Sequence, residues 1–293
     1  MNRDPFKNIL YKMKNNKKIM TIGDIHGRSN WKDILFGGET EFFLWRKSIE
    51  DNWLESNDKM HFEEYDKIIF VGDYCDSFNK TNEEILTNLK DIILFAKTYP
   101  EMVILLLGNH DVHYIVHNEC CSGYRGEMRA DLNELFKENE ELFRMAYLDE
   151  FDNDNFIIKT LWTHAGVTKG WHSELLKDIN SPSYRLNDFF IGSESWAIDK
   201  LINVSWKLRA TNVFNVDAHS GGNDLWAGPI WVRPTILKEF NLEGYDQVVG
   251  HTPQGSIIEF CPLLGVESNP QKLNTLTFVD ALQQNQVHII NRI

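Results

Sequence analysis

The sequence predicts an α/β (α+β) fold with two sheets and flanking helices. Two features of the 293-residue chain indicate this class. In the first half, short apolar runs of β-favouring residues alternate with a helical pattern, as in parallel strand–helix–strand units. Toward the C-terminus, short strand-like segments follow one another instead. Helices that first alternate with strands and then give way to them are typical of two sheets covered by helices.

The first three predicted strands are the apolar runs Lys18–Ile22, Lys67–Val71 and Met102–Leu107. Each run stops at a glycine followed by polar residues, and continuous apolar runs of this length suit strands buried on both faces of a sheet. Between the second and third runs, Thr81–Thr98 carries apolar residues at helical spacing and opens with a T-x-x-E capping box. We therefore expect a parallel strand–helix–strand unit here.

The middle of the chain predicts a long helix, a hairpin and a further helical stretch. Apolar residues on one side favour a helix over about Glu127–Tyr147. A hairpin is expected over Glu150–His164, with its turn at Asp152–Asn155. Mixed spacing of aromatic and aliphatic residues over Tyr184–Leu208 favours one or two helices. The closing strands are expected at Gln247–Val249, Ser256–Phe260, Leu276–Val279 and Val287–Ile290.

Composition limits the class of protein. Hydrophobic residues make up 42% and charged residues 25%, which excludes a disordered chain. Because no Pro/Gly/Ser-rich linker divides the sequence, we expect one domain over residues 1–293. Four cysteines are too few for a disulfide framework and favour a reducing cytoplasm. No secretory signal or membrane-length apolar stretch occurs, so we expect a cytoplasmic protein with no membrane partner.

The net charge bears on the partners. Thirty Lys and Arg against 43 Asp and Glu give a formal charge of −13. Extended, sequence-independent binding of nucleic acid needs a basic surface, so this charge disfavours it. A phosphate-bearing small substrate stays possible, because bound metal ions can reverse the local sign of the potential.

Polar residues gather where the predicted strands stop. The first three strands are followed by Gly-Asp-Ile-His-Gly at 23–27, Gly-Asp-Tyr-Cys-Asp at 72–76 and Gly-Asn-His-Asp at 108–111. Later strands end in Thr-His-Ala-Gly at 163–166 and Gly-His-Thr at 250–252. In an open α/β sheet, ligands bind outside the carboxyl ends of the strands. Taken singly, these residues are typical of strand-end turns; taken together, they indicate a site.

The residue types in these five blocks suit transition metals. Carboxylate, imidazole and amide oxygen together favour Mn²⁺, Fe or Zn²⁺ over Ca²⁺ or Mg²⁺, which seldom take histidine. The set is too large for one catalytic ion, which usually keeps three protein ligands. Two ions that share a carboxylate, typically ~3.5–4 Å apart, explain it better. Such pairs act on phosphoesters.

The five blocks, in this order, resemble the calcineurin-like metallophosphoesterase superfamily. They are most similar to its phosphoprotein-phosphatase branch, the Ser/Thr phosphatases and diadenosine tetraphosphatases, whose motifs are GDxHG, GDxxDRG, GNHE, an HG or HAG histidine and a late histidine. The likeness spans roughly residues 19–291. It implies the metallo-dependent phosphatase fold, in which two mixed β-sheets pack as a sandwich with helices outside and the metal site lies at the C-terminal strand ends.

The resemblance also implies roles for individual residues. Two groups of ligands would hold the ions, with Asp73 bridging them: Asp24 and His26 on one side, and Asn109, His164 and His251 on the other. His110 would be the general acid that protonates the leaving oxygen, oriented by Asp76.

Two departures from the family pattern affect substrate binding. The arginine that follows the second aspartate in GDxxDRG is missing, because Asp76 precedes Ser-Phe. Lys80 or Arg28 could replace its charge, and Arg233 matches the second phosphate-binding arginine. The segment 28–66 exceeds the family minimum, so we expect a family-variable insertion that forms either a specificity wall or an extra helical hairpin.

The resemblance implies hydrolysis of phosphomonoesters by in-line attack of a metal-bridging hydroxide, in the manner of Ser/Thr phosphatases. Two divalent or trivalent ions are expected, with Mn²⁺ preferred and Fe or Zn²⁺ as alternatives. The substrate stays open between a phosphoprotein, a nucleotide or dinucleoside polyphosphate, another phosphorylated small molecule, and a nucleic-acid end or cyclic phosphate. A metal-free scaffold is the alternative without catalysis.

Overall fold

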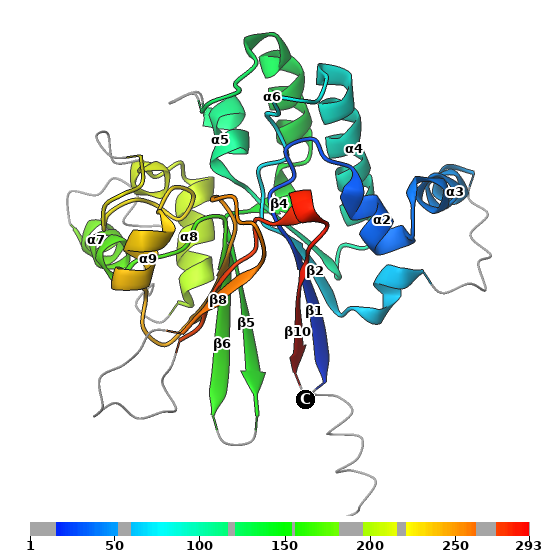
Figure 1. Cartoon of the computed structure of the whole chain (residues 1–293). Coiled ribbons are helices and arrows are strands. Elements are labelled where there is room, and N and C mark those ends of the chain that lie inside the picture. The colour runs from blue at the N-terminus through cyan, green and yellow to red at the C-terminus, as the bar shows by residue number, and fades with distance from the viewer. Residues whose placement is uncertain are drawn as a thin grey trace, which may run out of the picture.

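The computed structural model describes residues 16–51, 60–116, 121–153, 156–181, 196–215, 221–261 and 274–292. Two five-stranded sheets form its centre (Figure 1). The first has the order β10-β1-β2-β3-β4 and the second β5-β6-β7-β9-β8. The strands of the first are β1 (Lys17–Ile22), β2 (Lys67–Phe70), β3 (Val103–Leu106), β4 (Phe143–Arg144) and β10 (His288–Arg292). Those of the second are β5 (Ala146–Asp152), β6 (Ile157–Thr163), β7 (Asp246–Val249), β8 (Ile258–Phe260) and β9 (Leu276–Phe278).

Both sheets are mixed. In the first, β1 to β4 run parallel and β10 adds antiparallel to β1. In the second, β6, β7 and β9 run parallel, with β5 and β8 antiparallel at the edges. Side chains of both sheets bury one another between the layers, among them Ile69, Leu106, Trp162 and Val248. The Trp162 indole N–H donates to the Thr21 hydroxyl across this interface at 2.9 Å. The expected sandwich of two mixed sheets is confirmed.

Helices cover the outer sides of the sandwich. The longer ones are α2 (Asn30–Phe36), α3 (Glu39–Glu50), α4 (Asn82–Thr98), α5 (Asn109–Val116), α6 (Arg129–Glu138), α7 (Lys169–Asn180), α8 (Ile198–Lys207) and α9 (Pro234–Phe240). Figure 1 places α2 to α6 with the first sheet and α7 to α9 beside the second. Among the described helices, none has the length and apolarity needed to cross a bilayer.

Most predicted elements are confirmed within a residue or two. The helix α4 carries its capping box: the Thr81 side chain accepts from the Glu84 N–H at 3.2 Å, and the Thr81 N–H donates to the Glu84 carboxylate at 2.7 Å. The closing strands are also found. Of the stretch Tyr184–Leu208, α8 is helical, whereas residues 182–195 lie outside the described residues.

The long helix expected over Glu127–Tyr147 is wrong in its second half. The helix α6 ends at Glu138, a short 3-10 turn follows, and the chain then enters β4 and β5. Phe143 pairs with Leu105 of β3 and is buried there. An apolar spacing that also suits a helix is therefore overridden by tertiary pairing, and the hairpin begins at Ala146 rather than Glu150.

The described residues of the segment 28–66 pack as an outer helical layer, by which we mean α2, α3 and the 3-10 turn His61–Glu64 against α4. Its core is a cluster of rings: Trp31, Phe36, Phe42, Trp45 and Phe62 with Phe95 of α4. Asp91 of α4 is buried and adds an ion network, because its carboxylate lies 2.8 Å from the ammonium of the buried Lys32 and 2.7 Å from the guanidinium of the partly exposed Arg46. The buried ring cluster of this layer and the side chains of Lys32 and Arg46 thus contact α4.

Candidate metal centre and active site

Five strand-end loops meet at one edge of the sandwich. The loop after β1 is bonded directly to the loop after β2: the N–H groups of Ile25, His26 and Gly27 donate to the carbonyl oxygens of residues 72, 73 and 74. On the second sheet, the Gly250 N–H after β7 donates to the His164 carbonyl after β6 at 2.7 Å. The predicted convergence of these loops is therefore present in the fold.

The backbone at this edge adopts conformations that side chains usually avoid. Six described non-glycine residues have positive φ, and four of them belong to the site: His26 (45°), Asp73 (52°), Asp76 (55°) and His251 (67°). Such conformations cost of order 1–3 kcal/mol each and cluster at functional sites, where the surroundings hold them. The clustering of positive-φ residues at this edge therefore indicates a functional site.

The glycines of the blocks make room for the carboxylates. A Cβ at Gly108 would stand 2.0 Å from Asp73 Oδ1, and a Cβ at Gly250 would stand 2.0 Å from Asp24 Oδ1. No side chain tolerates such contacts. The glycine that opens the third and fifth blocks is therefore required by the carboxylate of another block.

The structure brings all six predicted ligands together. Two groups of donor atoms lie within 4.8 Å of one another: Asp24, His26 and Asp73 in one, and Asp73, His164 and His251 in the other. Asp73 is common to both. Asn109 Oδ1 joins the second group, at 3.0 Å from His164 Nε2 and 2.9 Å from His251 Nδ1.

The chemistry of this donor set fits metal ions. The buried His251 Nε2 has no hydrogen-bond partner, so a ring nitrogen is left free at the site. Burial, then the neighbouring Asp280 carboxylate, raise the pKa of Asp24 well above its usual value. Burial also raises the pKa of Asp280, to about 6. Burial lowers the pKa of His251 well below its usual value. Burial also opposes charge on the His164 imidazole, but the Asp73 and Asp24 carboxylates outweigh it and raise the pKa of His164 to about 9. Cations bound here would offset the repulsion between the Asp24 and Asp280 carboxylates.

A second group of polar side chains surrounds Asp76. His110 Nδ1 lies 2.9 Å from Asp76 Oδ2, as predicted for an acid and its orienting carboxylate. The Tyr114 hydroxyl donates to Asp76 Oδ1 at 2.5 Å, and His113 Nε2 lies 2.9 Å from Oδ2, outside hydrogen-bond alignment. Burial disfavours the charged imidazole, but the Asp73 and Asp76 carboxylates outweigh it and raise the pKa of His110. The protonated form that a general acid needs is thereby favoured.

Sequence reasoning missed His113 and Tyr114 as partners of Asp76. Both follow His110 on α5 at three and four residues, the spacing that places side chains on one helix face. That spacing was the available signal.

Asp111 and Asp280 were also missed. The buried Asp111 carboxylate accepts the N–H groups of Tyr74, Cys75 and Gly108 at 2.8, 3.2 and 2.9 Å, so it holds the second block in shape. Asp280 follows β9 and is nearly fully buried beside Asp24. Its position depends on strand order, which the sequence does not state.

A cavity of about 440 Å³ opens over the site and is lined by His26, Asp73, Asn109, His110 and His251, with Arg28, Arg233, Phe78 and Trp231 around them. The two arginines thus line the cavity, and their role in phosphate binding stays a prediction. Lys80 does not: its ammonium lies 3.1 Å from the Glu84 carboxylate and it is absent from the lining. Among the described residues of the segment 28–66, Arg28 is the one that lines the cavity, so the extra helical hairpin is the interpretation that fits.

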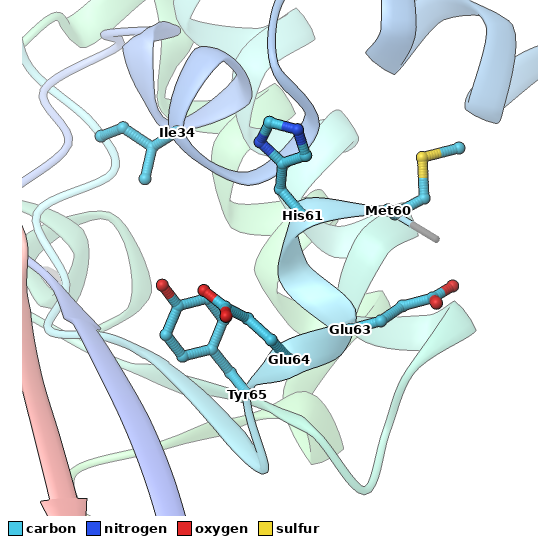
Figure 2. A pocket seen from close by; sticks show the side chains of 6 residues that line it. All are labelled: Ile34, Met60, His61, Glu63, Glu64 and Tyr65. Atoms are coloured by element: carbon cyan, nitrogen blue, oxygen red, sulfur yellow. The ribbon is translucent and has the colours of Figure 1, made fainter. Parts of the chain in front are cut away.

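A different cavity of about 410 Å³ lies beside the outer helical layer (Figure 2). Ile34, Met60, His61, Glu63, Glu64 and Tyr65 line it. The Glu64 carboxylate is paired with the Lys18 ammonium at 2.8 Å. This cavity contains none of the predicted site residues.

Comparison with known proteins agrees with this geometry. The model of the family described as calcineurin-like phosphoesterase matches residues 17–255. The chain belongs to the calcineurin-like phosphoesterase family. This phosphoesterase is thus a hydrolase of phosphoric ester bonds, in a family that is typically metal-dependent. The fold is similar to a crystal structure of the phosphatase domain from the Legionella effector WipB, at 12% identity and a TM-score of 0.39, over 84% of this chain and 95% of that one. No curated protein matches the sequence.

Proposed function

We propose that this phosphoesterase is a dinuclear metal-dependent phosphomonoesterase that works in the manner of Ser/Thr phosphatases. Asp24, His26 and Asp73 would hold one ion, and Asp73, Asn109, His164 and His251 the other. The observation that carries the proposal is that the two groups of donor atoms share Asp73. Mn²⁺ suits the mixture of carboxylate, imidazole and amide oxygen, with Fe and Zn²⁺ as alternatives.

The bound ions would supply Lewis acidity toward the phosphoryl oxygens and lower the pKa of a water molecule so that it attacks phosphorus. Arg28 and Arg233 provide further positive charge within the same cavity. Guanidinium groups match the geometry of phosphate oxygens and stay protonated. These two side chains therefore bind the phosphate and stabilise the charge on its equatorial oxygens.

His110 acts on the leaving group. It carries a proton on the ring nitrogen that does not face Asp76 and donates it to the departing oxygen. Asp76 fixes the ring through Nδ1, and the Tyr114 hydroxyl fixes Asp76 in turn. The Asp73 carboxylate accepts the His110 backbone N–H at 2.9 Å, so the acid and the proposed bridging ligand are held to each other directly.

The test compares two phosphomonoesters that differ in the quality of the leaving group. Nitrophenolate departs without a proton, whereas the alkoxide of glycerol phosphate needs one. With Mn²⁺ present, Asp73→Asn is expected to lose about a thousandfold or more in kcat on both substrates. His110→Ala is expected to lose about a hundredfold on glycerol phosphate and clearly less on nitrophenyl phosphate.

His61→Ala is the matched control, because it removes a histidine from the other cavity. It should leave both rates within twofold of the wild type. Equal rates in the wild type, Asp73→Asn and His110→Ala would refute the proposed mechanism. A His110→Ala loss of the same size on both substrates would remove the acid role and leave the metal-ligand assignments standing.

A further inference from the structure

We propose that the enzyme prefers phosphomonoesters whose leaving group is an aromatic ring bonded to the bridging oxygen, as in a phosphotyrosine side chain, and that Phe78 binds this ring. The inference rests on the proposed function, because it concerns the leaving group of that reaction. Its physical basis is the place of one exposed aromatic side chain relative to the general acid.

Phe78 is the most exposed large apolar residue among the described residues, with 83% of its surface accessible. Single exposed apolar side chains are common and need no explanation by themselves. Phe78, however, also lines the cavity that holds His110 and Asp73. Phe43 of α3, which is 62% exposed, lies in the outer helical layer and does not line this cavity.

The loop that carries Phe78 is held firmly. The Arg125 guanidinium donates to the carbonyl oxygens of Ser77 and, at 2.6 Å, of Lys80, one on each side of Phe78. The Arg125 backbone N–H also donates to the Tyr114 hydroxyl at 2.9 Å, and Tyr114 in turn bonds Asp76. The exposed ring therefore projects from a braced backbone, and a preformed surface loses less entropy when it binds a ligand.

The leaving group must lie on the side of the general acid, because His110 gives its proton to the departing oxygen. Phe78 belongs to that side: it follows Asp76 by two residues, and Asp76 bonds His110. Its ring also lies near Gly123, with ring carbons 3.6 and 3.8 Å from the Cβ position there. A ring attached to the departing oxygen would therefore reach the ring of Phe78.

The charged side chains of the cavity are placed so that an aromatic leaving group can bind beside Phe78. The arginines Arg28 and Arg233 come from other loops. Near Phe78 and Gly123 the lining consists of the uncharged Ser77, Asn79, Cys121 and Ser122 and of Asp76, whose carboxylate is already paired with His110 and Tyr114. A wall with an aromatic ring, whose one carboxylate is already paired, suits a neutral, flat group, and rings prefer offset or edge-to-face contacts with one another. In the reaction, the bond between phosphorus and the bridging oxygen breaks, water supplies the new oxygen on phosphorus, and the phenol leaves with the proton from His110.

The test measures the selectivity ratio, defined as kcat/KM for a phosphotyrosine peptide divided by kcat/KM for the phosphoserine peptide of the same sequence. Phe78→Ala is expected to lower this ratio about fivefold or more, and Phe78→Trp to restore it. The matched control Phe43→Ala removes an equally apolar exposed ring and should leave the ratio within twofold of the wild type. Adenosine monophosphate is measured in parallel.

An unchanged ratio in Phe78→Ala would overturn the inference, and so would a larger loss on adenosine monophosphate than on phosphotyrosine, since the aromatic group would then be a nucleobase. Either result leaves the proposed function intact as long as manganese-dependent hydrolysis of phosphoserine and glycerol phosphate persists. If the wild type hydrolyses none of these esters, the proposed function itself fails.

Discussion

Two buried clusters of charged side chains differ in how their charges are balanced. In the outer helical layer, Asp91 lies between the Lys32 ammonium and the Arg46 guanidinium, at 2.8 and 2.7 Å. At the strand ends, Asp24 lies beside Asp280, and burial together with this neighbour raises the pKa of the Asp24 carboxyl. The first cluster is complete within the chain. The second joins the neighbouring carboxylates of Asp24 and Asp280 to a His251 ring nitrogen that has no hydrogen-bond partner, and we expect cations from outside to complete it.

The largest effect on stability is expected from Asp91→Asn. Removing one member of a buried ion network leaves its partners uncompensated, which costs about 3–5 kcal/mol. We expect a loss of free energy of unfolding of that order in urea denaturation, because the Lys32 ammonium stays buried. The kcat of the folded fraction should stay within twofold of the wild type. A large loss of kcat at unchanged stability would contradict the assignment of this cluster to structure alone.

Among substitutions that keep all the proposed metal ligands, Gly108→Ala is expected to lower kcat most. The new Cβ would stand 2.0 Å from Asp73 Oδ1, so the carboxylate must move. A displacement of about 1 Å can cost a hundredfold in rate. Gly255→Ala is the control, since nothing lies within 4 Å of its Cβ position. Comparable manganese-dependent rates in the two variants would show that the position of Asp73 does not matter.

Asp24→Asn should separate stability from function. Because the folded pKa of Asp24 is raised above its unfolded value, ionisation destabilises the metal-free fold at neutral pH. The asparagine should therefore raise the Tm of chelated protein by about 2–4 °C. This gain should vanish below a pH of about 4, where the carboxyl is protonated in both states. Added Mn²⁺ should reverse the order and favour the wild type. If chelated Asp24→Asn had a lower Tm than the chelated wild type at neutral pH, the Asp24 carboxylate would not destabilise the metal-free fold.

The smallest effect is expected from Tyr114→Phe, which removes one donor to Asp76. Asp76 still contacts His110, so we expect a loss of kcat of about threefold to tenfold, in line with the ~0.5–1.5 kcal/mol of a typical hydrogen bond. The variant also leaves the Asp76 carboxylate less stabilised and moves the alkaline limb of the pH–kcat profile. A profile identical to the wild type would mean that Tyr114 does not position the acid.

The convergence of the strand-end residues could be predicted from residue type and position along the chain. Asp24, Asp73 and His164 follow buried apolar runs directly, and parallel strands place such residues at one edge whatever the details of packing. The apolar runs themselves predicted β1, β2 and β3, three of the four parallel strands of the first sheet.

Contacts that depend on helix faces and strand order could not be predicted in this way. Tyr114 meets Asp76 through the pitch of α5, and Asp280 meets Asp24 through the place of β9 in the second sheet. Lys80 was one of two candidates to replace the missing arginine, and its ammonium lies 3.1 Å from the carboxylate of Glu84, one helical turn along the chain. The predicted helix beyond Glu138 failed because pairing with β3 buries Phe143 better than a helix would.

The most direct test of the two-cation centre is anomalous diffraction from crystals of the protein grown with Mn²⁺. The account predicts two manganese peaks per chain on either side of the Asp73 carboxylate, one beside His26 and the other beside His164 and His251. A single peak, or peaks away from Asp73, would contradict it.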